Sequence, residues 1–102
     1  MAFKLTPDAT FPFTAVIPNG TAPLPIKLKG RRKSREDLAA FMGSARERSD
    51  TELLADAVAG WEDVDADFST EALGQLLTNY AGASLAIFTA YIKAHSEAER
   101  KN

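Results

Sequence analysis

Three aspartates at alternate positions, Asp63, Asp65 and Asp67, form the pattern in this sequence that most resembles a metal site. Carboxylates with this spacing open the calcium-binding loop of an EF-hand, which also needs glycine at its sixth position and glutamate at its twelfth. Counted from Asp63, those two positions hold Phe68 and Gly74. The sequence therefore predicts a solvated acidic loop near a helix start, without a bound metal.

Catalytic groups are also scarce. The chain has one histidine, His95, and no cysteine, so a cysteine nucleophile, a thiolate zinc site and a disulfide scaffold are excluded. No spacing suggests a Ser-His-Asp triad, and Gly30 and Gly43 do not form a phosphate-binding loop. We expect His95 to be partly buried or at the rim of a helix. The sequence predicts a binding or assembly protein that is not an enzyme and has no cofactor.

Charge is the most informative chemistry in the sequence. The net charge is −2, but the segment 27–35 carries six positive side chains and no negative one, whereas 50–71 carries eight carboxylates and no Lys or Arg. Such segregation can steer an acidic partner, or pair opposite ends of two copies. A small nucleic-acid-binding regulator that uses the 27–35 patch is the alternative; it is disfavoured because no aromatic side chain interleaves the basic ones and the chain as a whole is acidic. The basic candidates for partner contacts are Lys27, Lys29, Arg31, Arg32 and Lys33.

A β-hairpin over residues 10–30 must position this basic segment. Residues 10–17 are rich in β-formers, Pro18-Asn19-Gly20 is a turn signal, and residues 24–29 alternate apolar with basic side chains. Part of the hairpin should be an edge or an irregular strand, because three prolines lack a backbone donor: Pro12, Pro23 and Pro25. An exposed strand edge is itself an assembly surface.

The helical part is expected to cover residues 34–100 and to begin at Ser34, the predicted N-cap of a first helix that runs out through residues 46–48. Leu38, Phe41 and Met42 have the spacing of a buried stripe on that helix. They are also candidate partner contacts if the stripe is incompletely covered.

A second helix is predicted to start at Asp50 and to stop at Gly60. Its apolar face comprises Leu53, Leu54, Ala57 and Val58. The only tryptophan, Trp61, follows that glycine, and we expect its indole to pack with Val64 and Phe68 across the junction to the third helix.

Ser69 is the predicted N-cap of the third helix, with Phe68 before it and Leu73 at the spacing of a hydrophobic staple. Ala81-Gly82 should separate this helix from a fourth one over about residues 83–100. The predicted buried stripe of the fourth helix is Leu85, Phe88, Ile92 and His95, flanked by Ile87 and Tyr91. Leu85, Phe88 and Ile92 are further candidate partner contacts, and small residues at 83, 86, 90 and 94 would permit close helix approach.

These elements indicate an α+β fold, with an N-terminal β-hairpin packed against three to four helices. A chain of 102 residues is expected to form a single domain, 1–102, with one modest core. It shows no signal peptide and no apolar run that approaches a membrane span, so a cytoplasmic protein without membrane contact is expected.

The second half of the chain resembles the small tail assembly chaperones of long-tailed bacteriophages and prophages. The resemblance covers about residues 10–102 and is clearest over 58–102. It is carried by a Trp-centred loop, a helix start of the form Phe-Ser-x-Glu-x-Leu, and a terminal Lys-Asn; the residues are Gly60, Trp61, Val64, Phe68, Ser69, Glu71, Leu73, Leu76, Leu77, Tyr80, Ile87, Tyr91, Lys101 and Asn102.

The resemblance implies a non-enzymatic protein of the bacterial host cytoplasm that binds the tape measure protein while the tube polymerises, with tail tube subunits as a second candidate partner. It further implies a homo-oligomer, absence from the mature virion, and a second, longer product made by ribosomal frameshifting, of which this chain would be the short form. No catalytic residue is carried over. A structural tail or head-tail subunit that stays in the particle remains a second alternative.

Overall fold

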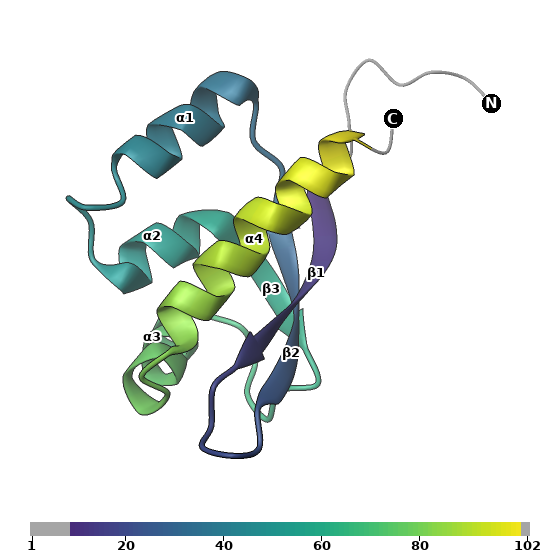
Figure 1. Cartoon of the computed structure of the whole chain (residues 1–102). Helices are drawn as coiled ribbons and strands as arrows, with labels where there is room; N and C mark the ends of the chain where they lie inside the picture. The colour runs from purple at the N-terminus through teal and green to yellow at the C-terminus, as the bar shows by residue number, and fades with distance from the viewer. Residues whose placement is uncertain (1–8, 101–102) are drawn as a thin grey trace.

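The computed structural model describes residues 9–100, which form a three-stranded antiparallel sheet and four helices (Figure 1). The predicted α+β class is confirmed. In chain order the elements are β1 (Thr10–Ile17), β2 (Leu24–Arg31), α1 (Arg35–Gly43), α2 (Asp50–Ala57), β3 (Val58–Glu62), α3 (Thr70–Asn79) and α4 (Ala83–Arg100). No helix within residues 9–100 is both long and apolar enough to cross a membrane.

The predicted hairpin is confirmed as β1 and β2, which pair over their full length from Thr10 opposite Arg31 to Ile17 opposite Leu24. Gly20 in the connecting turn has a positive φ of 58°, a conformation that glycine adopts without steric cost. Pro25 lies on β2 beyond the section that pairs with β3, so its missing N–H breaks no bond to that strand.

The third strand corrects two predictions. Val58 was expected in the second helix and Trp61 in a loop, but α2 ends at Ala57 and both residues lie on β3. This strand pairs antiparallel with β2, with Leu28 opposite Trp61, and a register shift lies between Lys29 and Gly30. Branched and aromatic side chains favour strands, and the unpaired edge of β2 supplies the backbone partners that a helical periodicity does not reveal.

Helix α4 covers one face of the sheet (Figure 1), and the strands alternate accordingly. On β1 the odd-numbered side chains from Phe11 to Ile17 are buried and the even-numbered ones from Thr10 to Val16 are exposed. Opposite residues in an antiparallel pair point to the same side, so the even face of β1 continues onto Lys27 and Lys29 of β2. No described element covers that second face.

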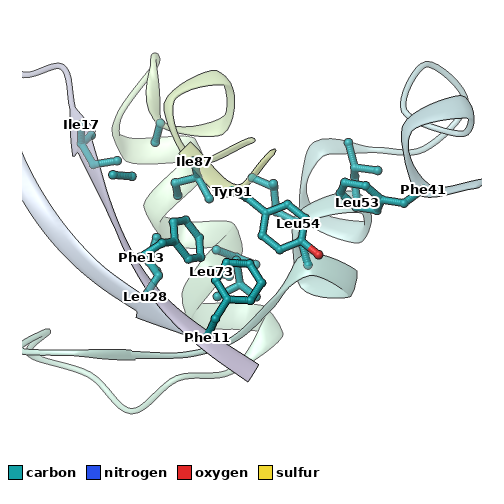
Figure 2. Close-up of a cluster of buried hydrophobic side chains, with 14 residues drawn as sticks. Phe11, Phe13, Ile17, Leu28, Phe41, Leu53, Leu54, Leu73, Ile87 and Tyr91 are labelled. Carbon is teal, nitrogen blue, oxygen red and sulfur yellow. The ribbon is translucent and has the colours of Figure 1, made fainter. Parts of the chain in front are cut away.

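Tyr91 on α4 lies at the centre of the core (Figure 2). Its ring centroid is 5.7 Å from that of Phe11, 5.9 Å from Phe13 and 5.6 Å from Phe41. The Tyr91 hydroxyl donates a hydrogen bond of 2.6 Å to the Arg31 carbonyl oxygen. Burial raises the pKa of Tyr91 to about 12; the charge of Asp56 acts in the same direction and that of Arg31 against it.

Of the four residues in the predicted buried stripe of α4, only His95 is buried. Leu85 is 71% exposed, and Phe88 and Ile92 are half-buried. The fully buried line is four residues apart throughout: Ala83, Ile87, Tyr91 and His95. Two apolar stripes adjoin each other on this helix. The sheet buries the one that contains Tyr91, whose ring packs against those of Phe11 and Phe13 on β1.

Helix starts follow the predicted capping chemistry with one correction. Ser34 and Ser69 cap α1 and α3, because their hydroxyls accept from the backbone N–H groups of Asp37 and Ala72 at 3.1 and 3.0 Å. The second helix is capped by Ser49 instead of Asp50. The serine hydroxyl reaches the backbone N–H three residues on, at 3.2 Å, which leaves Asp50 inside the first turn. Helix α1 also ends at Gly43, earlier than expected.

Trp61 and Phe68 close the acidic loop between β3 and α3. Their rings meet edge to face with centroids 5.0 Å apart, as predicted for the packing of these two side chains. The Trp61 Nε1–H also donates to the Ala66 carbonyl oxygen at 2.9 Å. Leu73 is fully buried one turn into α3. Trp61 thus joins a strand to the loop rather than one helix to the next.

Candidate partner-binding surfaces

The sheet face that α4 does not cover, here called the open face, carries the first half of the basic run. Its exposed side chains come from alternate positions of the three strands: Thr10, Pro12, Thr14, Val16, Pro25, Lys27, Lys29, Arg31 and Glu62. Lys27 approaches Asp63 at 3.9 Å with both side chains largely exposed. Neither Lys29 nor Arg31 forms an ion pair with a described residue, so the open face keeps two uncompensated cations.

The second half of the basic run turns inward. The Lys33 ammonium lies 3.1 Å from one Asp56 carboxylate oxygen, and Arg48 lies 3.1 Å from the other. The Lys33 backbone N–H donates to Nε2 of the buried His95 at 3.0 Å, and its ammonium sits 5.2 Å from the centre of the Phe41 ring. Arg32 is half-buried and engaged within the fold. These contacts tie the β2–α1 connection to α2 and α4 and leave Lys33 little room for a partner.

Asp56 is ionised for the same reason. Partial burial alone would raise its pKa, but hydrogen bonds from Arg48 and Lys33 and the charges of both hold it below the ordinary value of 3.8. The cluster of two cations and one carboxylate therefore ties the segments before and after α1 to α2. Among residues 9–100, no three His, Asp or Glu side chains come together in a way that could hold a metal ion.

An apolar groove, the second candidate surface, runs between β1 and α4. Its β1 side is lined by Pro12, Phe13, Thr14 and Val16, and its α4 side by Gly82, Leu85, Ala86, Thr89, Ala90, Lys93, Ala94 and Glu97. Val16 and Leu85, at 56% and 71%, are the two most exposed large hydrophobic side chains of the described chain. Contiguous exposed apolar surface of this kind marks interaction sites on soluble proteins.

No described strand pairs with the outer edge of β1, which borders this groove. The Arg32 N–H donates to the Ala9 carbonyl oxygen at 2.9 Å, which makes the next pair, Thr10 and Arg31, a non-hydrogen-bonded one. By the same alternation, the backbone groups of even-numbered β1 residues point away from β2. Pro12 is one of them and has no N–H to offer, so a partner strand could not add to this edge without a gap.

The remaining apolar candidates scatter. Phe41 is buried and stacks on Phe88 at 5.7 Å, while Leu38 and Ile92 are half-buried around them. Met42 is 47% exposed but lies on α1, outside the groove. Of the six apolar residues named from sequence, only Leu85 lines the groove. The residues of its β1 wall were not predicted. Alternation along a strand could have identified Val16, because Val16 points to the side of β1 opposite the buried Ala15 and Ile17.

A family model for phage tail assembly chaperones matches residues 1–102, the whole chain. The protein belongs to the phage tail assembly chaperone family. No curated protein and no solved structure shows a significant match to it.

The resemblance noted over about residues 10–102 is thus confirmed and extends to the whole chain. Its terminal Lys101-Asn102 lies outside the described residues. Membership gives the chaperone a role in the assembly of a phage tail. The family is generally non-enzymatic. Four of the residues that carry the resemblance have structural roles at the β3–α3 junction: Trp61, Phe68, Ser69 and Leu73.

Proposed function

We propose that the chaperone binds the tape measure protein during tail assembly and that the groove between β1 and α4 is the binding site. The observation that carries this proposal is the coincidence of the two most exposed large apolar side chains, Val16 and Leu85, on the two walls of one groove. A chaperone for a long helical protein has to cover apolar stripes that would otherwise aggregate. A helix laid in an apolar groove is a common way to do so.

The lining of the groove favours a helix as the occupant. Ala86, Ala90 and Ala94 follow one another at helical spacing along the α4 wall, and their small side chains let a second helix approach closely. The gap that Pro12 leaves at the β1 edge disfavours an added strand. Lys93 and Glu97 stand at one end of the groove and can pair with charges that flank an amphipathic stripe.

Further features of the proposal follow from the family. The chaperone would act in the cytoplasm of the bacterial host, associate with itself, and leave before the virion is complete. Tail tube subunits are a second candidate partner. A nucleic-acid-binding regulator receives less support, since Lys33 is paired with Asp56 and Lys27 approaches Asp63. A structural subunit of the particle is the other alternative.

The test is co-expression with the tape measure protein of the same phage, scored by the soluble yield of that protein. Thr89 is exposed in the middle of the α4 wall, so Thr89→Arg should fill the groove and abolish solubilisation while the fold survives. Thr78→Arg is the matched control, because Thr78 is an exposed helical threonine on α3, away from the groove.

Wild type and Thr78→Arg should rescue the tape measure protein equally, and Thr89→Arg should not. Equal rescue by both variants would place the binding surface elsewhere. No rescue by wild type would remove the tape measure protein as the partner. Detection of the chain in purified virions would instead support the structural subunit.

A further inference from the structure

The groove between β1 and α4 has two ends of different chemistry. Phe11, near the start of β1, packs against His95, near the end of α4, with ring centroids 5.5 Å apart. Gly82, just before α4, lies against Pro18, just after β1. The strand and the helix therefore run in opposite directions along the groove (Figure 1).

Both walls change from apolar to charged in the same direction. One end holds Val16 on β1 and Leu85 on α4, the two exposed apolar side chains described above. At the other end the β1 wall finishes at Pro12, and the α4 wall finishes at Lys93 and Glu97. These last two side chains stand one helical turn apart with opposite charges, so α4 itself adds no net charge there.

The net charge at this end comes from β2, on the other side of the β1 rim. Lys29 is the strand partner of Pro12, and Arg31 is the strand partner of Thr10. Partners in an antiparallel pair project from the same face with their Cβ atoms about 5 Å apart. Pro12 lines both the groove and a shallow hollow of the open face that Lys29 also borders. The groove therefore continues over the β1 rim onto a surface that carries two cations.

These two cations are available to a partner, because neither forms an ion pair with a residue of the described range 9–100. Lys27, one place nearer the apolar end, differs: it lies opposite Glu62 on β3 and approaches Asp63 at 3.9 Å. The Lys29 Cδ rests 3.9 Å from the place where a side chain at Gly60 would begin. Since glycine has no side chain to hold it there, the flexible lysine stem can turn towards the groove.

We propose that the groove selects amphipathic helices that carry carboxylates at one end. An apolar anchor of such a helix packs between Val16 and Leu85, and its carboxylates pair with Lys29 and Arg31. The negative end of a helix dipole is the C-terminal one, so the carboxylates belong on the C-terminal side of the anchor. This inference rests on the proposed function, because it names the class of helix that the same groove takes.

The length of the groove sets the spacing between anchor and carboxylates. Val16 and Pro12 are separated by four residues of strand, about 13 Å. Leu85 and Lys93 are separated by eight residues of helix, about 12 Å. A bound helix rises 1.5 Å per residue, so its carboxylates should follow the anchor by about eight or nine residues. An amphipathic helix with evenly scattered charges does not meet this requirement.

Fluorescence anisotropy with two designed peptides of about 18 residues, which span about 27 Å as helices, tests the proposal on the full chain. Both peptides carry the same apolar stripe in their first half. One has a group of glutamates about nine residues after the anchor, and the other has lysines there. At about 0.05 M NaCl the wild type should bind the glutamate peptide roughly three- to tenfold more tightly, and the difference should shrink at about 0.5 M NaCl. A third peptide of the same composition, with its glutamates beside the anchor, should bind more weakly than the first.

Reversal of the two cations is the matching change in the protein. Lys29→Glu/Arg31→Glu should reverse the preference, so that the lysine peptide binds more tightly. The control is Arg35→Glu/Arg46→Glu, which makes the same change in net charge at two exposed sites outside the sheet and the groove and should keep the wild-type preference. If circular dichroism shows that the charge reversal unfolds the chain, Lys29→Gln/Arg31→Gln should abolish the preference instead.

Equal binding of the glutamate and lysine peptides by the wild type, or no binding of either, would overturn the proposal. So would a preference that persists in Lys29→Glu/Arg31→Glu or is lost in the Arg35 and Arg46 control. Retention of the wild type on a DNA oligonucleotide, lost in Lys29→Glu/Arg31→Glu, would assign the two cations to nucleic acid instead.

The failure of this inference and that of the proposed function give different results. If both peptides bind equally and Thr89→Arg loses both, the groove binds helices without selecting their charge, and the proposed function stands while this inference falls. If the wild type does not solubilise the tape measure protein, the proposed function falls whatever the peptides show.

Discussion

Replacement of Tyr91 by phenylalanine should remove one hydrogen bond and change how stability depends on pH. The ring, which packs against Phe11, Phe13 and Phe41, is kept. The lost bond is the 2.6 Å contact from the hydroxyl to the Arg31 carbonyl oxygen. Its net contribution is about 1 kcal/mol, with up to about 2 kcal/mol more if the carbonyl stays unsatisfied. Tyr91→Phe should therefore unfold at lower urea than wild type at pH 7.

The sign of the alkaline effect follows from the raised pKa. The Tyr91 pKa is about 12 in the folded chain against 10.0 ordinarily, so its contribution is complete below pH 10 and is lost as the pH rises towards 12. At about pH 11 the wild type should have lost about 1.4 kcal/mol that Tyr91→Phe never had, because one pKa unit corresponds to that energy. The gap between the two proteins should close or nearly close.

Urea unfolding followed by Trp61 fluorescence at pH 7, 8, 9, 10 and about 11 measures both effects. The indole is a suitable probe because it packs against Phe68 in the folded chain. All other groups are common to the two proteins, so their contributions cancel in the difference. A gap that stays constant up to pH 11 would refute the link between burial of the hydroxyl and stability. A deficit above about 3 kcal/mol at pH 7 would mean that the ring itself had moved.

Two further substitutions probe the packing and the ion pairs. Gly30→Ala should destabilise by about 1–3 kcal/mol in urea unfolding, because the new Cβ would lie 2.8 Å from Phe11 Cζ; Gly43→Ala, where nothing lies within 4 Å, is the control that should be neutral or slightly stabilising. Asp56→Asn should cost at most about 1 kcal/mol at pH 7, since the carboxylate is 40% exposed. Because the pKa of Asp56 is lowered, its stabilisation is present above its ordinary value of 3.8 and is lost as the pH falls below it, so thermal melts of the two proteins should converge at low pH; a gap that persists there would contradict this.

Local features of the fold could be predicted from short stretches of sequence. The turn at residues 18–20, the caps at Ser34 and Ser69 and the break before Ala83 each depend on residues within four positions of one another. The alternation over residues 24–29, in which Leu28 is buried between exposed Lys27 and Lys29, likewise requires only a period of two. These predictions succeeded because the bonds involved, from hydroxyl to nearby N–H or across a short turn, form between neighbours in the chain.

Features that depend on contacts between distant segments were decided only by the tertiary structure. Residues 58–62 became a strand because the edge of β2, some thirty positions earlier, offers backbone partners. Lys33 turned inward because Asp56 and His95 lie beside it, although its sequence neighbours suggested a continuous basic patch. On α4 the sheet buries Tyr91 and leaves Leu85 in water, since only one of two adjoining stripes can face the strands. The chain by itself therefore determined where its elements begin and turn, while contact between elements determined which side chains remain for a partner.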